Sequence, residues 1–194
     1  MNTLFKDFRN HILFHLNKHD VKYKIFGSVV VCLVDADRTT TDIDLMIQKD
    51  EENINNLIKA LVDAGFGDES DVTQMVWNEY KEPWEREYSN FSLSHYNSDW
   101  EDFNIDVLFN LGEKDYDDLP SEEYDDNGIR MVIVPLLEIA KMKAKVQPRP
   151  RPQDLRDIKF IADHLGLDPS TGEPVQSKTD SWFSPSNLFG GKKK

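Results

Sequence analysis

Two aspartates separated by a single apolar residue constrain this chain more than any other feature. Asp42 and Asp44 stand at the start of segment 42–47, whose other residues are all apolar. Successive side chains of an extended strand alternate between its two faces, so both carboxylates point to one side while Ile43 and Leu45 point into a core. Like charges this close repel each other unless a cation lies between them, and oxygen ligands alone suit Mg²⁺. The pattern predicts a half-buried strand that carries a divalent-metal site.

A glycine–serine pair, Gly27 and Ser28, precedes this strand. It follows segment 23–26, for which we expect a short strand, and opens the apolar segment 29–34. We expect a helix there, although its β-branched residues are weak helix formers. Backbone N–H groups at the start of a helix bind anions. A phosphate site beside a metal site indicates chemistry on a nucleoside triphosphate.

A third acidic residue, Asp106, is the candidate that completes the metal site. It lies in segment 103–109, whose odd-numbered residues are apolar and share one face, while Asn104 and Asp106 share the other. If a neighbouring strand brings it beside Asp42 and Asp44, three carboxylates would hold one or two Mg²⁺ ions. The alternative is that Asp106 is a solvent-facing residue of a half-buried strand.

Segments with strand periodicity and segments with helix periodicity alternate along the chain. We expect a core over 1–134, a small helical C-terminal part over 135–167, and a flexible tail over 168–194 without any visible period. The acidic stretch 113–126 indicates a solvated loop. The expected strands are 23–26, 42–47, 72–77, 91–95, 103–109 and 129–134, and the expected helices are 3–18, 29–34, 51–64, 135–142 and 153–165.

Apolar residues near the end of the tail leave two interpretations open for it. Trp182, Phe183, Leu188 and Phe189 lie shortly before three final lysines. Segment 180–194 is therefore either a disordered end or a short motif that docks a protein partner.

Charge and cysteine content exclude several classes of protein. The net charge of −13 argues against a broad, non-specific nucleic-acid binder, which is normally basic. One cysteine, Cys32, excludes an internal disulfide and fits a reducing cytosol. No apolar run approaches the ~20 residues of a membrane helix, and Lys6, Arg9 and His11 interrupt any signal-peptide core. We therefore expect a cytoplasmic protein with no membrane partner.

The glycine–serine pair and the three aspartates described above resemble the signature of the nucleotidyltransferase superfamily of the polymerase-β type. That family carries a Gly-Gly or Gly-Ser turn, then an acid-x-acid pair, then a third acid on a later strand. Arg38, just before the acidic pair, looks like the small bacterial and phage branch that includes AbiEii-type toxins. The matching positions here are Gly27 and Ser28, then Asp42 and Asp44, then Asp106.

A second motif of that branch matches farther along. It is a lysine-bearing helix followed by an Arg/Asp-rich helix start, so the resemblance covers roughly residues 23–165. The resemblance implies an α/β (α+β) fold with a mixed β-sheet flanked by helices. The matching residues here are Lys141, Lys143, Lys145, Arg149, Arg151, Asp154, Arg156 and Asp157.

The resemblance implies a role for each carboxylate and for the serine. Ser28 and nearby N–H groups would hold the terminal phosphates of an NTP. Asp42 and Asp44 would bind both metal ions. Asp106 would bind the catalytic ion and assist deprotonation of the incoming hydroxyl. Mg²⁺ would be the cofactor.

The resemblance also implies roles for basic residues, for which the residues themselves leave alternatives. Lys143, or its neighbour Lys141, would contact the triphosphate, but lysines on a helix are also typical of a solvated face. Arg38 would either touch phosphate or brace the loop before Asp42. For Asp154, in the first turn of the last expected helix, we favour stabilisation of the positive helix end, while the role of Asp157 stays open.

Three histidines, His11, His15 and His19, recur every four residues in the first expected helix. Such spacing can bind a transition metal. Their stripe overlaps the apolar face of the helix, so we expect packed or boundary histidines instead.

The chain is thus expected to be a Mg²⁺-dependent nucleotidyltransferase. It would move a nucleoside monophosphate from an NTP to a hydroxyl of RNA, protein or a small molecule, a tRNA 3′ end being one acceptor. The alternatives are a non-catalytic adaptor with this fold, which docks a partner through its tail, and a toxin–antitoxin or phage regulatory module.

Overall fold

The computed structural model describes residues 3–81, 90–95, 97–112, 114–145 and 150–168. The chain divides into two compact units, Met1–Met142 and Lys143–Lys194. Apart from residue 168, the predicted tail lies outside the described residues, and so does segment 180–194, for which a disordered end and a docking motif were both left open. The domain boundaries predicted after residues 134 and 167 stay a prediction.

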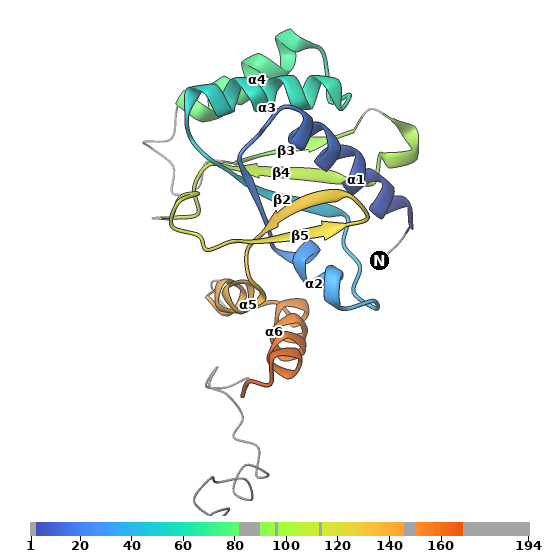
Figure 1. Ribbon diagram of the computed structural model, residues 1–194, viewed down its shortest axis with the longest axis vertical. Helices are drawn as coiled ribbons and strands as arrows, with labels where there is room; N and C mark the ends of the chain where they lie inside the picture. Colours follow the sequence, from blue (N-terminus) through green and yellow to red (C-terminus); the bar gives the residue numbers. More distant parts are fainter. Residues whose placement is uncertain (1–2, 82–89, 96, 113, 146–149, 169–194) are drawn as a thin grey trace, which may run out of the picture. The chain divides into compact units, whose positions relative to one another are not determined.

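A mixed β-sheet forms the centre of the first unit, and its six described strands run in the order β3-β4-β2-β1-β6-β5 (Figure 1). β1 pairs antiparallel with β2 and parallel with β6, while β2 pairs parallel with β4. This sheet, with helices packed on it, confirms the predicted fold class. The strands are β1 (Tyr23–Phe26), β2 (Asp42–Ile47), β3 (Asn90–Ser94), β4 (Asn104–Leu108), β5 (Glu122–Asp126) and β6 (Ile129–Ile133).

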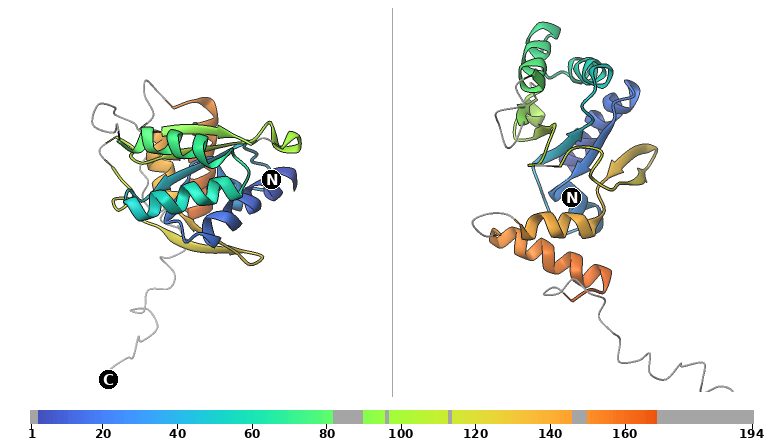
Figure 2. Two further views of the ribbon diagram at one scale, coloured as in Figure 1. Left: turned by 90° about the horizontal axis from the view of Figure 1, so that it is seen from above. Right: turned by 90° about the vertical axis from the view of Figure 1, so that its left-hand side faces the viewer.

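The helices of the first unit cover the sheet, and α5 runs across the boundary to the second unit. α3 contacts both α1 and α4, and Figure 2 shows α3 and α4 side by side. Among the described residues, no helix combines the length and the apolar composition that crossing a membrane requires. The helices are α1 (Thr3–Lys18), α2 (Ser28–Val34), α3 (Glu51–Asp63), α4 (Glu69–Lys81), the 3₁₀ turn η1 (Ser98–Trp100), α5 (Leu136–Ala144) and α6 (Pro152–Leu165).

Local sequence determines both ends of helix α3 and its buried face. The Asp50 side chain accepts the N–H of Asn53 and caps the helix, and the acidic Glu51 and Glu52 lie at its positive end. Gly65, at φ +85°, follows the last turn. The buried stripe of the helix consists of Ile54, Leu57, Ile58 and Leu61.

The strand predicted over 72–77 is wrong, because this segment lies in helix α4. Val72 and Val76 are its buried apolar residues, and a spacing of four is helical. Upstream, the Asp68 side chain accepts the N–H of Asp71, as an N-cap residue does. The β-branched residues at 72, 73 and 76 favoured a strand by propensity, but the buried spacing decides for the helix.

The acidic stretch 113–126 is a loop only in part, since its end forms strand β5. β5 is an outer strand with one neighbour, and the side chains of its first four residues are exposed. Glu123 on β5 pairs with Arg130 on β6 at 2.6 Å. A strand with no buried face shows no apolar alternation, so the sequence pattern could not reveal it.

Histidines from α1 and from the end of β3 meet at the C-terminal end of α3. The carbonyl oxygen of Ala64 lies 3.0 Å from His11 Nε2 and 2.7 Å from His95 Nε2. The Asn97 N–H donates to His95 Nδ1 at 2.9 Å, so His95 is held as the neutral tautomer protonated at Nε2. His15 packs its ring on His11 at 4.7 Å, and its buried Nδ1 has no hydrogen-bond partner. These histidines are packed, as expected.

The free energy of unfolding should therefore fall as the pH drops below 6.5. Burial, the largest cause, lowers the pKa of both His15 and His95 from 6.5. Below pH 6.5 the unfolded chain then binds protons that the folded chain does not. The contribution of the neutral histidines to the free energy of unfolding is therefore complete above pH 6.5 and is lost as the pH falls toward the lowered pKa values. Urea unfolding between roughly pH 7.5 and 5.5 measures this slope.

The double variant His15→Gln/His95→Gln should show a flatter dependence than the wild type over the same range. His164→Gln, which changes an exposed histidine, is the matched control and should keep the wild-type slope. Equal slopes for all three proteins would contradict the assignment.

Candidate active site

The pairing of β2 with β4 brings together the carboxylates that the sequence singled out. In this parallel pair Asp44 lies opposite Asp106, and Asp42 lies opposite Asn104. Residues opposite each other point to the same face, and neighbouring strands lie about 4.8 Å apart. Asp42, Asp44 and Asp106 therefore share one face of two adjacent strands. All three are partly exposed, whereas Ile43 on the opposite face is fully buried.

The turn after β1 packs directly against one of these carboxylates. Gly27 has φ +72° and ψ −146°, a conformation that favours glycine. A Cβ at Gly27 would lie 2.1 Å from Asp44 Oδ2. Phe26, the residue before it, lies opposite Asp44 in the β1–β2 pair. Gly27 thus allows the backbone to approach the acidic face closely.

Ser28 and Arg38 lie beside this turn. Ser28 opens α2, and the Arg38 guanidinium donates to Ser28 Oγ at 2.8 Å. A second nitrogen of Arg38 donates to the carbonyl of Thr39. These bonds connect the arginine to Thr39 in the loop before β2 and set its positive charge next to the serine. Both roles considered for Arg38 stay predictions.

Oxygen atoms are the donors on the acidic face, which is the chemistry that Mg²⁺ selects. Asp42 Oδ1 already accepts hydrogen bonds from Thr41 Oγ1 at 3.2 Å and from Asn104 Nδ2 at 3.5 Å. Across the described part of the chain, no group of three or more His, Cys, Asp or Glu side chains is arranged to hold a metal ion. The donors fit Mg²⁺ chemically, and a bound cation would draw the carboxylates together by side-chain rotation.

Lys141 and Lys143 differ in their exposure and in their ion-pair partners. Lys141 is exposed and pairs with Glu138 on the same helix at 2.6 Å. Lys143, in the second unit, is buried, and its ammonium lies 3.0 Å from Asp154 Oδ1 and 2.9 Å from Asp157 Oδ2. The signal for its burial is its spacing of four from buried Ile139.

Asp154 does more than stabilise a helix end. Its carboxylate accepts hydrogen bonds from the Arg151 side chain and backbone as well as from Lys143. Arg151 is the largest cause that holds the pKa of Asp154 well below its usual range, and Lys143 adds to it against the opposing effect of burial. Asp154 and Asp157 together neutralise a buried lysine, a role that their place in the sequence did not reveal.

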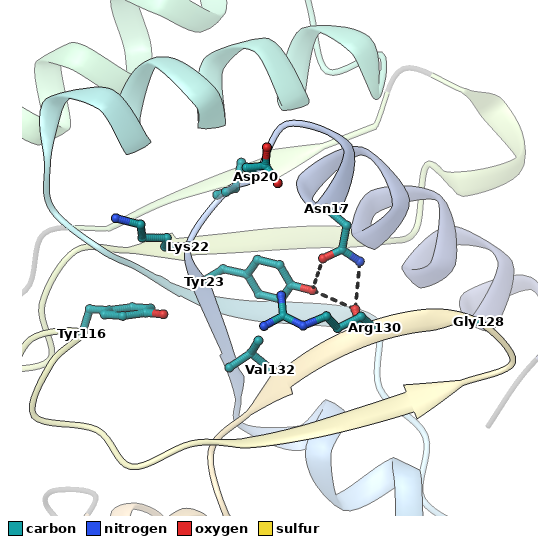
Figure 3. Close-up of a pocket in the computed structure, with 9 residues that line it drawn as sticks. Asn17, Asp20, Lys22, Tyr23, Tyr116, Gly128, Arg130 and Val132 are labelled. Atoms are coloured by element: carbon teal, nitrogen blue, oxygen red, sulfur yellow. Dashed lines mark hydrogen bonds between the residues drawn. The ribbon is translucent and has the colours of Figure 1, made fainter.

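A cavity of about 410 Å³ lies at the other end of β1, away from Gly27 (Figure 3). The hydroxyl of Tyr23 lies 3.1 Å from Asn17 Oδ1 and 3.0 Å from the Arg130 carbonyl, and Asn17 donates to the same carbonyl. Burial raises the pKa of Tyr23 to about 12. The Tyr23 hydroxyl, the Asn17 amide and the Arg130 carbonyl thus satisfy one another.

Replacing Gly27 by alanine should destabilise the fold more than replacing Gly128, which has a similar positive φ. Both residues are left-handed, at +72° and +87°, but a Cβ meets Asp44 at Gly27 and nothing within 4 Å at Gly128. We expect Gly128→Ala to lower the free energy of unfolding by about 1–2 kcal/mol, because alanine disfavours a positive φ. Gly27→Ala should lower it by a further 1–3 kcal/mol or so, because the new Cβ overpacks against Asp44. Urea unfolding measures both, and equal costs would contradict the close contact.

Lys143→Met should lower the free energy of unfolding by roughly 3–5 kcal/mol, because two buried carboxylates lose the cation that they share. The matched variant Lys141→Met breaks an exposed pair and should change it by less than about 1 kcal/mol. Equilibrium denaturation of both variants separates a buried ion pair from a solvated face. Similar costs for the two lysines would rule out the buried network.

Comparisons with known proteins identify the fold and the family. Two solved structures share the fold: an antigenic nucleotidyltransferase-like protein from Paracoccidioides brasiliensis and the antibiotic-resistance factor ANT(2'')-Ia. The first is 17% identical with a TM-score of 0.51, over 82% of this chain and 76% of its own. The second is 14% identical with a TM-score of 0.51, over 86% of each chain. No curated protein matches the chain.

The family match covers most of the sequence. The family described as "Nucleotidyl transferase AbiEii toxin, Type IV TA system" matches residues 28–176, a range that contains Ser28, Asp42, Asp44, Asp106 and the Lys143 network. The chain therefore belongs to the AbiEii nucleotidyltransferase toxin family, and it is a nucleotidyltransferase enzyme.

Proposed function

We propose that this enzyme uses Mg²⁺ to transfer a nucleoside monophosphate from an NTP to a hydroxyl acceptor, with release of pyrophosphate. The observation that carries the proposal is the register of β2 and β4, which sets Asp44 opposite Asp106 and leaves Asp42 on the same face. In-line transfer of a nucleotidyl group needs positioning and charge neutralisation rather than a covalent intermediate. An acidic face for cations beside a basic, hydroxyl-bearing loop meets that need.

Each residue of the face has a role in this proposal. Asp42, Asp44 and Asp106 hold Mg²⁺, which when bound neutralises phosphate charge and makes an incoming hydroxyl more nucleophilic. Asp106 also accepts the proton of that hydroxyl. Gly27 keeps the backbone close to Asp44, so that the N–H groups of the turn can reach phosphate oxygens.

Cations of the chain bind the triphosphate in this proposal. Arg38 and the hydroxyl of Ser28 already contact each other, and both can turn to phosphate oxygens. Lys141 is held by an exposed ion pair that is worth little and can be exchanged for phosphate. For Lys143 a contact with the triphosphate stays a prediction, while its two buried carboxylate partners support a structural role.

As acceptor we propose a 3′-terminal hydroxyl of RNA, with tRNA as the first substrate to test. The resemblance of Arg38 and the acidic pair to the toxin branch supports this choice. The net charge of −13 disfavours a broad nucleic-acid groove, so a short RNA end suits the chain better than a long duplex. We place the reaction in the cytoplasm, where a chain with one buried cysteine stays reduced. A protein partner for segment 180–194 stays a prediction.

The test is transfer of an α-³²P-labelled NTP to total RNA, to purified tRNA and to protein, with Mg²⁺ or with EDTA. Label should be transferred in the presence of Mg²⁺ and not in the presence of EDTA. Asp42→Asn or Asp44→Asn should lower the transfer rate by roughly 10³-fold, since the metal supplies several kcal/mol at the transition state. Asp37→Asn removes the same charge from an exposed position of the neighbouring loop and should keep wild-type activity.

Four outcomes discriminate among the candidate functions. Label on RNA supports the proposal, and label on protein alone keeps the reaction but changes the acceptor. NTP binding in calorimetry without any transfer would favour the adaptor. Absence of both binding and transfer would overturn the proposal.

A further inference from the structure

Two serines of the outer strand β3 lie on the acidic face. β3 pairs antiparallel with β4, and its register sets Ser92 opposite Asp106 and Ser94 opposite Asn104. Residues two apart on a strand share a face, and opposite residues on neighbouring strands have side chains in contact range. Both serine hydroxyls therefore reach the row of polar side chains that β4 and β2 present.

Ser92 contacts the third carboxylate directly. Its hydroxyl donates a hydrogen bond to Asp106 Oδ1. An ionised carboxylate only accepts, so the single proton of Ser92 must point at Asp106. This bond restricts rotation of the carboxyl group and leaves Oδ2 available for a cation. Leu93, between the two serines, is buried on the opposite face and fixes the strand in this orientation.

Ser94 reaches Asp42 through Asn104. The Ser94 hydroxyl lies 2.5 Å from Asn104 Oδ1, and Asn104 Nδ2 lies 3.5 Å from Asp42 Oδ1. The opposite amide orientation would turn an oxygen toward the Asp42 carboxylate, where two acceptors would repel each other. The acceptor-only carboxylate of Asp42 thus sets the amide orientation of Asn104, and the Ser94 hydroxyl holds that amide by donating to its Oδ1. The chain Ser94–Asn104–Asp42 thus crosses three adjacent strands.

We propose that Ser92 and the Ser94–Asn104 pair are positioning residues, which orient Asp106 and Asp42 for the cation. This inference rests on the proposed function and adds the outer strand to the site. The two serines affect different carboxylates. Ser92 contacts Asp106 directly, whereas Ser94 reaches Asp42 through the side-chain amide of Asn104. Oriented carboxylates lose less rotational freedom when a cation draws them together, so the effect appears in metal affinity.

The first test compares Ser92→Ala with Ser92→Thr in the full-length chain. Loss of the hydroxyl should raise the Mg²⁺ concentration for half-maximal transfer by about tenfold, the size expected for one hydrogen bond to a charged group. KM for the NTP at saturating Mg²⁺ should change by less than about twofold. Ser92→Thr keeps the hydroxyl on a residue that suits a strand, and should restore the wild-type value.

The second test measures the metal without catalysis. Mn²⁺ binding in the presence of a non-hydrolysable NTP analogue, followed by loss of the free-ion EPR signal, should weaken about tenfold in Ser92→Ala. Asn104→Ala should weaken it by a smaller factor, since its bond to Asp42 is long. Ser94→Ala, which acts one step farther away, should weaken it least.

Thr73→Ala in α4 removes a hydroxyl from a helix that packs on α3, and it should leave transfer and Mn²⁺ binding unchanged. Thermal unfolding of every variant identifies any that lose the fold. The inference is overturned if the wild type transfers label and Ser92→Ala keeps the wild-type Mg²⁺ and Mn²⁺ dependence. If the wild type neither transfers label nor binds the analogue, the proposed function fails instead.

Discussion

The parallel pairing of β2 with β4 is the interaction on which the rest of the molecule depends. It aligns Asp44 with Asp106 and Asp42 with Asn104, and so collects three negative charges on one face of the sheet. Collecting like charges costs free energy. The opposite face of the same strands offsets that cost, because Ile43, Leu45 and Ile105 are fully buried there. The fold is held by one face of these strands, which leaves the other free for chemistry.

Groups from three separate segments of the chain surround the acidic face. The backbone at Gly27 approaches Asp44, the Arg38 guanidinium holds Ser28, and the serines of β3 donate to β4. None of these groups lies in the acidic pair itself. The groups that shape the acidic face are therefore distributed over the turn after β1, the start of α2, strands β3 and β4 and the loop before β2, although the sequence signature is short.

Sequence reasoning recovered local features and missed long-range ones. The expected bounds of β1 and β2 agree with the structure, and those of α3 and α6 agree to within one residue. The predicted face of Asp106 follows from its strand, but its register against Asp44 depends on pairing that no local pattern encodes. The burial of Lys143 depends on Asp154 and Asp157 from another helix, and β5 has no buried face to leave a pattern. Propensity misassigned α4 because its valines suit either element.

The order of the strands in the sequence determines when the acidic face can form. β1 and β2 are near neighbours in sequence and form an antiparallel pair, whereas β4 begins only at Asn104, long after β2 ends. Closing so large a loop is entropically costly, so contacts of this kind depend on chain that must first be synthesised. A ribosome-bound chain that ends before β4 carries the acidic pair without its third carboxylate. The acidic face is thus complete only once β4 has been synthesised and has paired with β2.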